Sequence, residues 1–203
     1  LTVLEADEST RYLVLEMGAS GPGHIAYLTD IAPLDAAGVL MIGHAHMGGF
    51  GSIEGVAAAK AEIIAGLRPE GIAILNADDA RAAAMAELAP ARVLTFSAQG
   101  RQADLRAENV DLDAVARAAF DLHLPGLAEP RRVQLAVAGM HNVSNALAAA
   151  GLALAVGIAP ELIAERLGSV SIESPHRMDI SELSGDLLLI DDSYNANIDS
   201  MTA

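Results

Sequence analysis

The chain contains no cysteine and no tryptophan, and aromatic residues make up only 3% of its 203 residues. The absence of cysteine excludes a disulfide framework, a thiolate nucleophile and a thiolate zinc site. Basic residues are also scarce, because 12 lysines and arginines face 27 acidic residues and leave a net charge of −15. Such a surplus argues against nonspecific nucleic-acid binding. The longest apolar stretch, residues 146–159, is too short to cross a bilayer, so we expect a cytoplasmic protein without membrane insertion.

Two further features are missing from the sequence. No P-loop of the form GxxxxGK[ST] occurs in it, and the glycine-rich stretch 18–23 lacks the lysine that would let it replace one. The chain also begins at Leu1, inside an apolar pattern, instead of at a methionine. We therefore expect a piece of a longer protein, without a complete loop for nucleotide phosphates.

Strand-like and helix-like segments alternate along the first hundred residues. Apolar runs predict strands at 12–16, 36–42, 71–75 and 92–96, and helical patterns predict helices at 24–31, 52–67 and 79–88. Such alternation predicts a mostly parallel sheet flanked by helices. Short alternating segments between 102 and 137, with a turn at Pro125-Gly126, predict a small antiparallel patch. Two more helices are expected, at 142–157 and 160–167.

The pattern changes again near residues 169–175, where we place a domain boundary. Residues 1–170 are expected to form one α/β domain, and residues 171–203 the start of a second. Leu187–Ile190 is predicted to be a buried strand that ends in Asp191 and Asp192. In open α/β sheets, ligands bind just beyond the carboxyl ends of strands. The polar run after this strand is therefore a candidate ligand site, and an acidic turn capped by its own side chains is the structural alternative.

Three separated residues carry candidate chemistry in the first domain. Lys60 falls within the apolar stripe of its predicted helix, where burial favours a neutral amine that can react with carbon dioxide; a lysine reaching solvent from the edge of the stripe is the alternative. Glu16 ends the first predicted strand, or is simply a solvated acid. His46 lies in a glycine-rich loop, and with His44 it also imitates a weak two-histidine metal motif.

Amide and guanidinium side chains form a second group of candidates. Asn142 and Asn145 lie three residues apart at a predicted helix start, where they could contact a polar ligand or cap the helix. Arg177 suits a phosphate, or forms a surface ion pair in a linker. The stretch Asn76–Asp79 follows a strand, and a helix cap by Asp78 or Asp79 is its structural interpretation.

The run Asp191–Met201 reads DDSYNANIDSM, and it resembles the signature that opens the C-terminal domain of the Mur ligases that add D-alanyl-D-alanine. That signature has proline where this chain has Ile198. Further resemblances are the AH-x-x-x-FGS loop around His46, the AKxE pattern at Lys60, the HNxxNA pattern from His141 and the NADD stretch from Asn76. The resemblance implies a Mur ligase central domain, of ATPase type but without its P-loop, followed by the first strand of a Rossmann-like C-terminal domain.

The resemblance also implies a reaction and its participants. ATP would phosphorylate the carboxylate of UDP-N-acetylmuramoyl-tripeptide, and the amine of D-alanyl-D-alanine would attack the acyl phosphate. By position, Glu16, His46 and a carbamylated Lys60 would bind Mg²⁺. Nucleotide contacts would come from Asn142, Asn145, Arg177 and Asp192, and the substrate cleft would be lined by Ser193, Tyr194, Asn195 and Asn197. The parent enzyme is expected to be a monomer, and this piece alone to lack ligase activity.

Departures from the family pattern support a second hypothesis. The strand before His46 usually ends in asparagine in these ligases, but Met41 stands at that place and cannot make comparable hydrogen bonds. Together with Ile198 and the missing P-loop, this leaves open a diverged module that binds a nucleotide or a partner without turnover.

Overall fold

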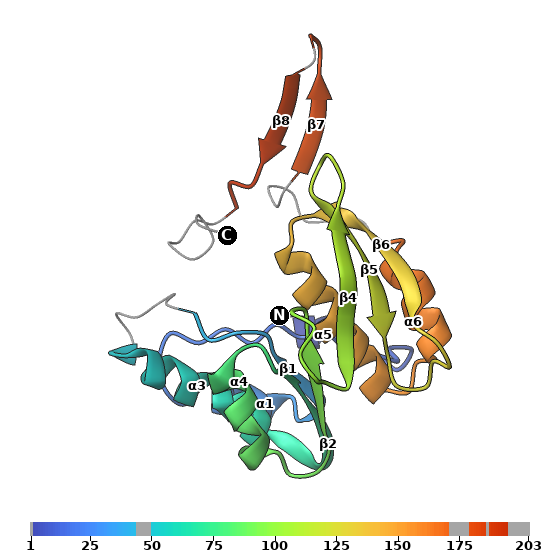
Figure 1. Cartoon of the computed structure of the whole chain (residues 1–203). Helices are drawn as coiled ribbons and strands as arrows, with labels where there is room; N and C mark the ends of the chain where they lie inside the picture. Colours follow the sequence, from blue (N-terminus) through green and yellow to red (C-terminus); the bar gives the residue numbers. More distant parts are fainter. Residues whose placement is uncertain (1, 44–49, 171–178, 186, 195–203) are drawn as a thin grey trace.

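The computed structural model describes residues 2–43, 50–170, 179–185 and 187–194 (Figure 1). It contains a six-stranded sheet with helices on both faces and a separate two-stranded sheet. The strands are β1 (Leu34–Val39), β2 (Leu67–Asn76), β3 (Val93–Ser97), β4 (Leu105–Leu112), β5 (Arg117–His123), β6 (Arg131–Ala138), β7 (Asp179–Leu183) and β8 (Leu187–Asp191). The α-helices are α1 (His24–Ile31), α3 (Ile53–Ala65), α4 (Ala80–Ala84), α5 (His141–Ala155) and α6 (Pro160–Leu167), and the short helices η1 (Thr2–Glu5) and η2 (Met85–Leu88) are of the 3-10 type.

The large sheet confirms the mixed α/β fold expected from the sequence. Its strands lie in chain order, β1 to β6. Pairing is parallel from β1 to β4 and antiparallel from β4 to β6, so the antiparallel patch forms one side of the sheet. The turn into β6 is set by Pro125-Gly126: the Leu127 N–H donates to the Leu124 carbonyl, and Gly126 has the positive φ of 94° that a type II turn requires at this place.

Local caps explain where two of the predicted helices begin. The Ser52 hydroxyl accepts from the Gly55 N–H at the start of α3. Asp79 caps α4 by accepting from the N–H groups of Arg81 and Ala82, as the structural interpretation of the NADD stretch expected. Each cap satisfies backbone donors that a helix leaves unpaired in its first turn.

The core lies on both faces of the parallel strands. Because strand side chains alternate, Ile74 of β2 packs with α5 on one face, while Ala73 and Leu75 pack with α3 on the other. Helix α5 lies so close to β2 that a Cβ on Gly151 would come within 2.8 Å of the Ile74 side chain. This contact fixes α5, whose N-terminus carries Asn142, against the sheet. No helix in the described residues is long and apolar enough to cross a membrane.

The strand predicted at 12–16 is not formed. These residues pair with no described strand, and their side chains are largely solvent-exposed, with Val14 at 83%. An apolar run becomes a strand only where a neighbouring strand accepts its backbone hydrogen bonds. The apolar run is present in the sequence, but the sequence pattern does not show whether a neighbouring strand is available to pair with it.

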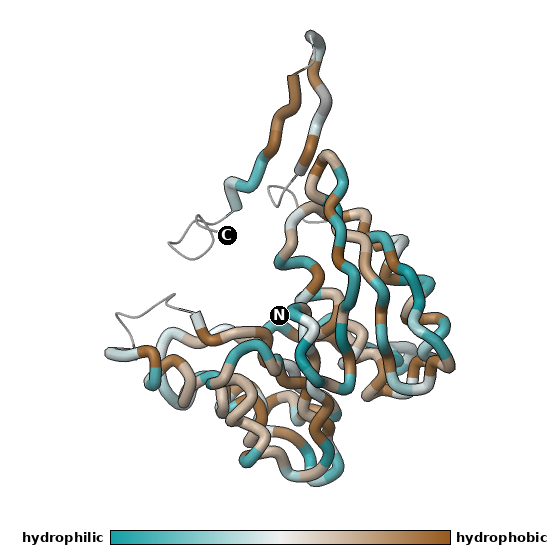
Figure 2. The backbone as a smooth tube through the Cα atoms, viewed as in Figure 1, coloured by the Kyte–Doolittle hydropathy of each residue, from teal (hydrophilic) through white to brown (hydrophobic). Residues whose placement is uncertain are grey.

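The second sheet also differs from expectation. Residues Leu187–Ile190 form β8, but β8 pairs antiparallel with β7 and is therefore one arm of a hairpin. Its side chains are 46–63% exposed instead of buried. Figure 2 shows the resulting hydrophobic arm, which stands away from the large sheet. A run of four apolar residues predicts a strand but does not say what covers it.

The outward face of β4, β5 and β6 carries a network of ion pairs. Arg106 and His123 both contact the Glu108 carboxylate, at 2.8 and 2.9 Å. Arg132 bridges Asp111 and Asp121 on the same face. Hydrogen bonding from Arg106 lowers the pKa of the Glu108 carboxyl, and His123 lowers it further.

Replacing Glu108 with glutamine is expected to make the chain's stability less sensitive to acid. The folded-state pKa of Glu108 lies below its unfolded value of about 4.3, so its stabilisation is present above that pH and is lost as the pH falls through the folded value. The difference in unfolding free energy between wild type and Glu108→Gln should therefore shrink between about pH 6 and about pH 3. Urea titrations across this range would measure it. Exposed Glu87→Gln serves as the control, and a constant offset for Glu108→Gln would contradict the prediction.

Candidate functional site

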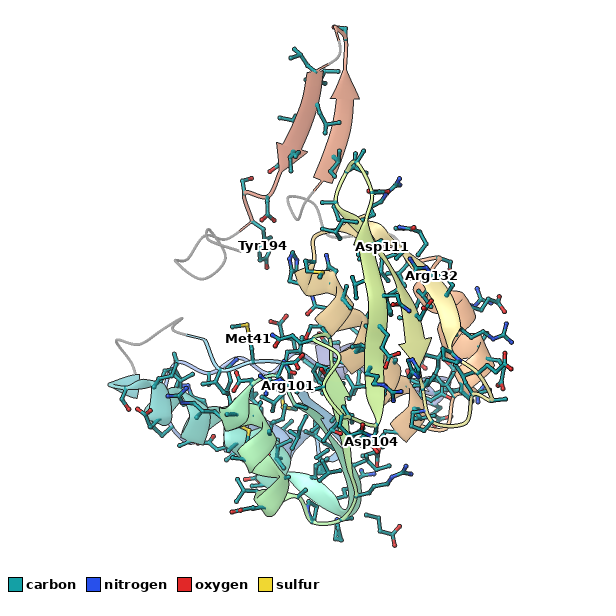
Figure 3. The ribbon with its side chains drawn as sticks, viewed as in Figure 1. Met41, Arg101, Asp104, Asp111, Arg132 and Tyr194 are labelled. Atoms are coloured by element: carbon teal, nitrogen blue, oxygen red, sulfur yellow. The ribbon has the colours of Figure 1, made fainter. Side chains whose placement is uncertain are left out.

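The carboxyl ends of three parallel strands meet at one edge of the large sheet. Strands β1, β2 and β3 are parallel neighbours, so the segments that follow them, 40–43, 76–79 and 97–101, share that edge. Ligands of α/β proteins bind at such an edge. Figure 3 shows Met41 and Arg101, from two of these segments, on the side of the domain that faces Tyr194.

Side chains hold the backbone just beyond β1 at three successive residues. The Asn76 amide donates to the Leu40 carbonyl at 2.7 Å, and Lys60 Nζ donates to the Met41 carbonyl at 3.1 Å. The Ile42 N–H donates to the Asp79 carboxylate at 2.7 Å. Because these partners come from β2, α3 and the start of α4, the stem of the loop that carries His46 is fixed from three elements.

Lys60 is the best-defined of the predicted site residues. It is the only lysine of the chain, and it is half-buried on α3. Burial lowers the pKa of its amine, and the charge of Asp79 opposes this effect in part. The amine therefore reaches its neutral form at lower pH than an exposed lysine does. The hydrogen bond to Met41 lies in an exposed setting, so the reactive amine and the lysine that reaches solvent from the stripe's edge both stay predictions.

Met41, the main departure from the family pattern inside the domain, has a simple structural account. Its side chain is 50% exposed, and only its backbone carbonyl takes part in the contact with Lys60. A main-chain contact is available to any residue type at this position. The substitution therefore leaves the support of Lys60 intact.

The AKxE pattern contributes a second contact that sequence reasoning did not find. The Glu62 carboxylate accepts from the N–H groups of Gly23 and Ala26, at 2.6 and 3.0 Å. Both donors lie at the start of α1, where the helix dipole favours a negative charge. Glu62 thus ties α1 to α3, and the only sequence signal for this was its place in the motif.

Of the two other predicted metal ligands, the structure describes only Glu16. Glu16 is exposed, and it makes no hydrogen bond or ion pair with another described residue. His46 lies outside the described residues. No group of three or more histidine, aspartate or glutamate side chains that could hold a metal ion is found in the described ranges. An unmodified ammonium group cannot bind a cation, so the metal site at Glu16, His46 and a carbamylated Lys60 stays a prediction.

Asn142 and Asn145 are linked to each other and do not cap α5. The Asn142 amide donates to the Ala138 carbonyl at 2.7 Å, and the Asn145 amide donates to the Asn142 side-chain oxygen at 2.9 Å. The residue at the cap position is Met140, and it makes no side-chain cap. The capping alternative is therefore wrong for both asparagines. Asn142 is anchored to the end of β6 and half-buried, whereas Asn145 is exposed and free to meet a ligand.

The C-terminal run begins with a turn directly after β8. The Ser193 N–H and hydroxyl both donate to the Asp191 carboxylate, which gives the turn after β8 its shape. Asp192, Ser193 and Tyr194 are exposed. The remaining predicted residues of this group, Asn195, Asn197 and Arg177, lie outside the described residues.

Asp78 of the NADD stretch also holds the turn after β3, a contact that sequence reasoning missed. The Asp78 carboxylate is only 7% exposed, and it accepts from the Ser97 hydroxyl and from the N–H groups of Ala98 and Gln99. The Ser97 hydroxyl oxygen in turn accepts from the Arg101 N–H. Asp78 thereby fixes the turn after β3 across about twenty residues of sequence, a distance at which no local pattern could have shown the contact.

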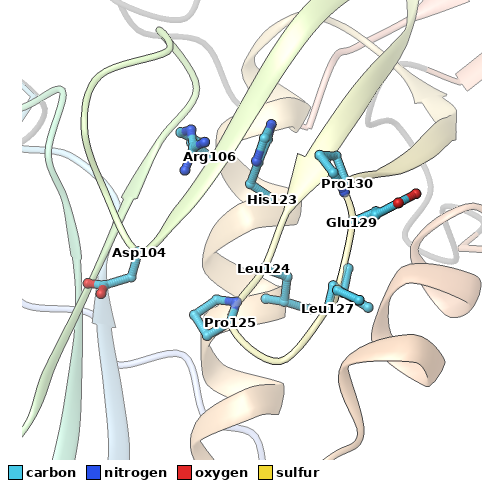
Figure 4. Close-up of a pocket in the computed structure, with 9 residues that line it drawn as sticks. Asp104, Arg106, His123, Leu124, Pro125, Leu127, Glu129 and Pro130 are labelled. Carbon is cyan, nitrogen blue, oxygen red and sulfur yellow. The ribbon is translucent and has the colours of Figure 1, made fainter.

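An open cavity lies away from this edge, at the turn between β5 and β6 (Figure 4). It has a volume of about 230 Å³, and its walls include Arg106, His123 and Glu129. Both basic groups already contact Glu108. We therefore give the cavity no role in the chemistry at the carboxyl edge.

The fold and the polar groups at its carboxyl edge define an α/β domain in which this edge is the expected place for a ligand. Comparison with protein families makes this specific. The profile of the Mur ligase middle domain matches residues 1–153, so the chain belongs to the Mur ligase family.

Two curated relatives carry the same name. The UDP-N-acetylmuramoyl-tripeptide--D-alanyl-D-alanine ligase of Mycobacterium tuberculosis strain H37Rv is 44% identical over 202 residues, and that of Escherichia coli K12 is 38% identical over 205 residues. The alignments cover 100% of this chain but only 39% and 44% of those proteins. The chain thus spans less than half the length of these relatives.

Solved structures agree with the sequence comparison. MurF from Acinetobacter baumannii superposes with a TM-score of 0.91 at 37% identity, covering 99% of this chain and 43% of that one. MurF ligase from Thermotoga maritima, solved in complex with ADP, gives a TM-score of 0.75 at 27% identity, covering 93% of this chain and 42% of that one.

Proposed function

We propose that the complete protein is an ATP-dependent ligase that adds D-alanyl-D-alanine to UDP-N-acetylmuramoyl-tripeptide in peptidoglycan synthesis. The similarity to ligases of that name along the entire chain supports the proposal most directly. The proposed reaction passes through an acyl phosphate, and it needs no covalent intermediate with the enzyme. A monomeric, cytoplasmic enzyme fits this proposal, and both properties remain predictions.

We also propose a role for each predicted site residue. The first domain, placed at 1–170, would carry the metal ligands Glu16, His46 and carbamylated Lys60. Mg²⁺ held there would offset negative charge on the transferring phosphoryl group. The carbamate would give Lys60 the anionic oxygen that its amine lacks, and its remaining N–H could still donate to the Met41 carbonyl. The segment 171–203 would begin the second domain.

The nucleotide is proposed to lie between the two parts. Asn142 and Asn145 would contact the adenine end, Asp192 the ribose and Arg177 a phosphate. An ADP complex of the Thermotoga relative supports nucleotide binding in this family. Ser193, Tyr194, Asn195 and Asn197 would line the cleft for the peptide substrates. This chain supplies no P-loop, so the cradle for the phosphates must come from elsewhere in the complete protein.

The complete reading frame, expressed and purified, provides the test. We expect phosphate release that requires ATP, the nucleotide-linked tripeptide and D-alanyl-D-alanine together. The 203-residue chain alone should release none. A complete protein that binds nucleotide but shows no release with all three substrates would favour the non-catalytic module instead.

Asn145→Ala is expected to raise the KM for ATP about tenfold in the complete enzyme, which corresponds to the loss of one hydrogen bond of roughly 1.4 kcal/mol. Its amide contacts only the Asn142 side chain within the described structure, so folding should be unaffected. Steady-state kinetics at saturating peptide substrates would measure the change. Gln134→Ala, on the outward side of β6, is the control. An unchanged KM for ATP would remove Asn145 from the proposed nucleotide site.

A further inference from the structure

Among the basic residues that the structure describes at the carboxyl edge, Arg101 is the most exposed. Its backbone is fixed by the hydrogen bond from its N–H to the Ser97 hydroxyl, at 2.9 Å. Its side chain is nevertheless 61% exposed. The loop thus holds the Cα of this arginine in place while leaving its guanidinium accessible.

The contact with Asp78 leaves most of the hydrogen-bonding capacity of the Arg101 guanidinium unused. Arg101 Nε lies 3.6 Å from an Asp78 oxygen, longer than a hydrogen bond. That carboxylate already accepts three shorter hydrogen bonds, from Ser97, Ala98 and Gln99. Arg101 makes no ion pair with any other residue in the described ranges. Asp78 therefore orients the guanidinium, but leaves its two-pronged face for another oxyanion.

Space for a ligand exists beside this loop. Residues 98–100 form one wall of an open pocket of about 490 Å³, and residues 107–110 of β4 form the other. Other cations near the edge are engaged: Lys60 donates to the backbone and Arg81 pairs with Glu54. In a chain of net charge −15, an anionic substrate needs a local positive group to hold it.

We propose that Arg101 binds an oxyanion, a phosphate or carboxylate, of one of the ligase's substrates, with Asp78 as the positioning residue behind it. This inference rests on the proposed function and assigns that site a further specificity-determining residue. The oxyanion can belong to ATP, to the nucleotide-linked tripeptide or to D-alanyl-D-alanine, and the three are separated by measuring each one in turn.

The test compares Arg101→Ala, Arg101→Lys and wild type in the complete protein. We expect Arg101→Ala to raise the KM of one substrate about 10- to 100-fold, the range for loss of a charge-assisted hydrogen bond, with kcat changed much less. Arg101→Lys should recover part of the loss, because it retains the charge without the planar fork. A purely structural role would instead lower the melting temperature and leave all three KM values alike.

The matched control is Arg68→Ala. Arg68 is exposed to a similar degree, at 54%, but it pairs with Asp35 at the opposite, amino-terminal end of β2. The Arg68→Ala variant should have the wild-type KM for each of the three substrates.

Direct binding separates this inference from the proposed function. Equilibrium titrations of the complete protein with ATP, with the nucleotide-linked tripeptide and with D-alanyl-D-alanine do not require turnover. If the wild-type protein lacks ligase activity, a selective loss of binding in Arg101→Ala would still support the inference. If Arg101→Ala and Arg68→Ala bind all three ligands as wild type does, the assignment of Arg101 is wrong.

Discussion

Lys60→Arg is expected to lower kcat of the complete enzyme by at least about 100-fold, the magnitude typical of losing one group that stabilises transition-state charge. Arginine retains a positive charge and can still donate to the Met41 carbonyl, but it cannot form a carbamate. Structure and stability should therefore change little while the proposed anionic ligand is lost. Initial rates of phosphate release, with a melting curve for each protein, would measure both effects. Arg68→Lys, an exposed substitution remote from the edge, is the control for general effects.

The carbamate itself can be observed without turnover. This experiment uses the 203-residue chain, in which Lys60 is the only lysine. We expect ¹³C-bicarbonate to label one side chain of that polypeptide in addition to its N-terminal amine. The lowered pKa of Lys60 means that labelling should begin at lower pH than for a free lysine side chain. The side-chain signal should be missing in Lys60→Arg, while the N-terminal signal remains. An identical spectrum for both proteins, or an unchanged kcat, would argue against this role.

Asp78→Ala is expected to destabilise the chain by about 2–4 kcal/mol, because it leaves the Ser97 hydroxyl and the Ala98 N–H without their buried acceptor, and the Gln99 N–H with the Ser97 hydroxyl alone. For a chain of this size, that loss corresponds to a fall in melting temperature of roughly 4–16 °C. Differential scanning calorimetry would measure it. Asp35→Ala removes an exposed carboxylate that pairs only with Arg68, and it should cost no more than about 0.5 kcal/mol.

Asp78→Asn refines the same prediction. The amide oxygen of the asparagine can still accept one part of these hydrogen bonds. Its NH₂ group, however, replaces a carboxylate oxygen that accepts in the wild type, and an NH₂ group cannot accept from an N–H or O–H donor. An intermediate loss of stability is therefore expected. If Asp78→Ala had the melting temperature of the wild type, Asp78 would not be the residue that holds the turn after β3. Its proposed role in positioning Arg101 would then also be wrong.

A structural feature could be predicted from the sequence when the residues that form it lie close together in the chain. Helix starts at Ser52 and Asp79 were predictable because the cap and the groups it accepts from lie within three residues of each other. The turn at Pro125-Gly126 was predictable for the same reason. The family, too, could be inferred from short motifs, because each motif is a contiguous stretch whose residue types are fixed together.

Longer-range features could not be predicted in this way. Whether 12–16 formed a strand depended on a neighbour for its backbone, and whether 187–190 was buried depended on what packs over the hairpin. Asn142 fits a helix cap by sequence alone, yet its amide bonds the end of β6 instead.

The sequence by itself determined the family, the alternating α/β plan and the identity of Lys60 as the residue to examine, because periodicity, caps and motifs are all local. Only the tertiary structure decided how that residue is supported. Asn76, Lys60 and Asp79 reach three consecutive backbone positions beyond β1 from segments 19 to 37 residues away, and Asp78 holds the loop that presents Arg101. Such contacts arise when parallel strands bring their carboxyl ends to one edge, and a linear sequence does not encode that proximity in any local pattern.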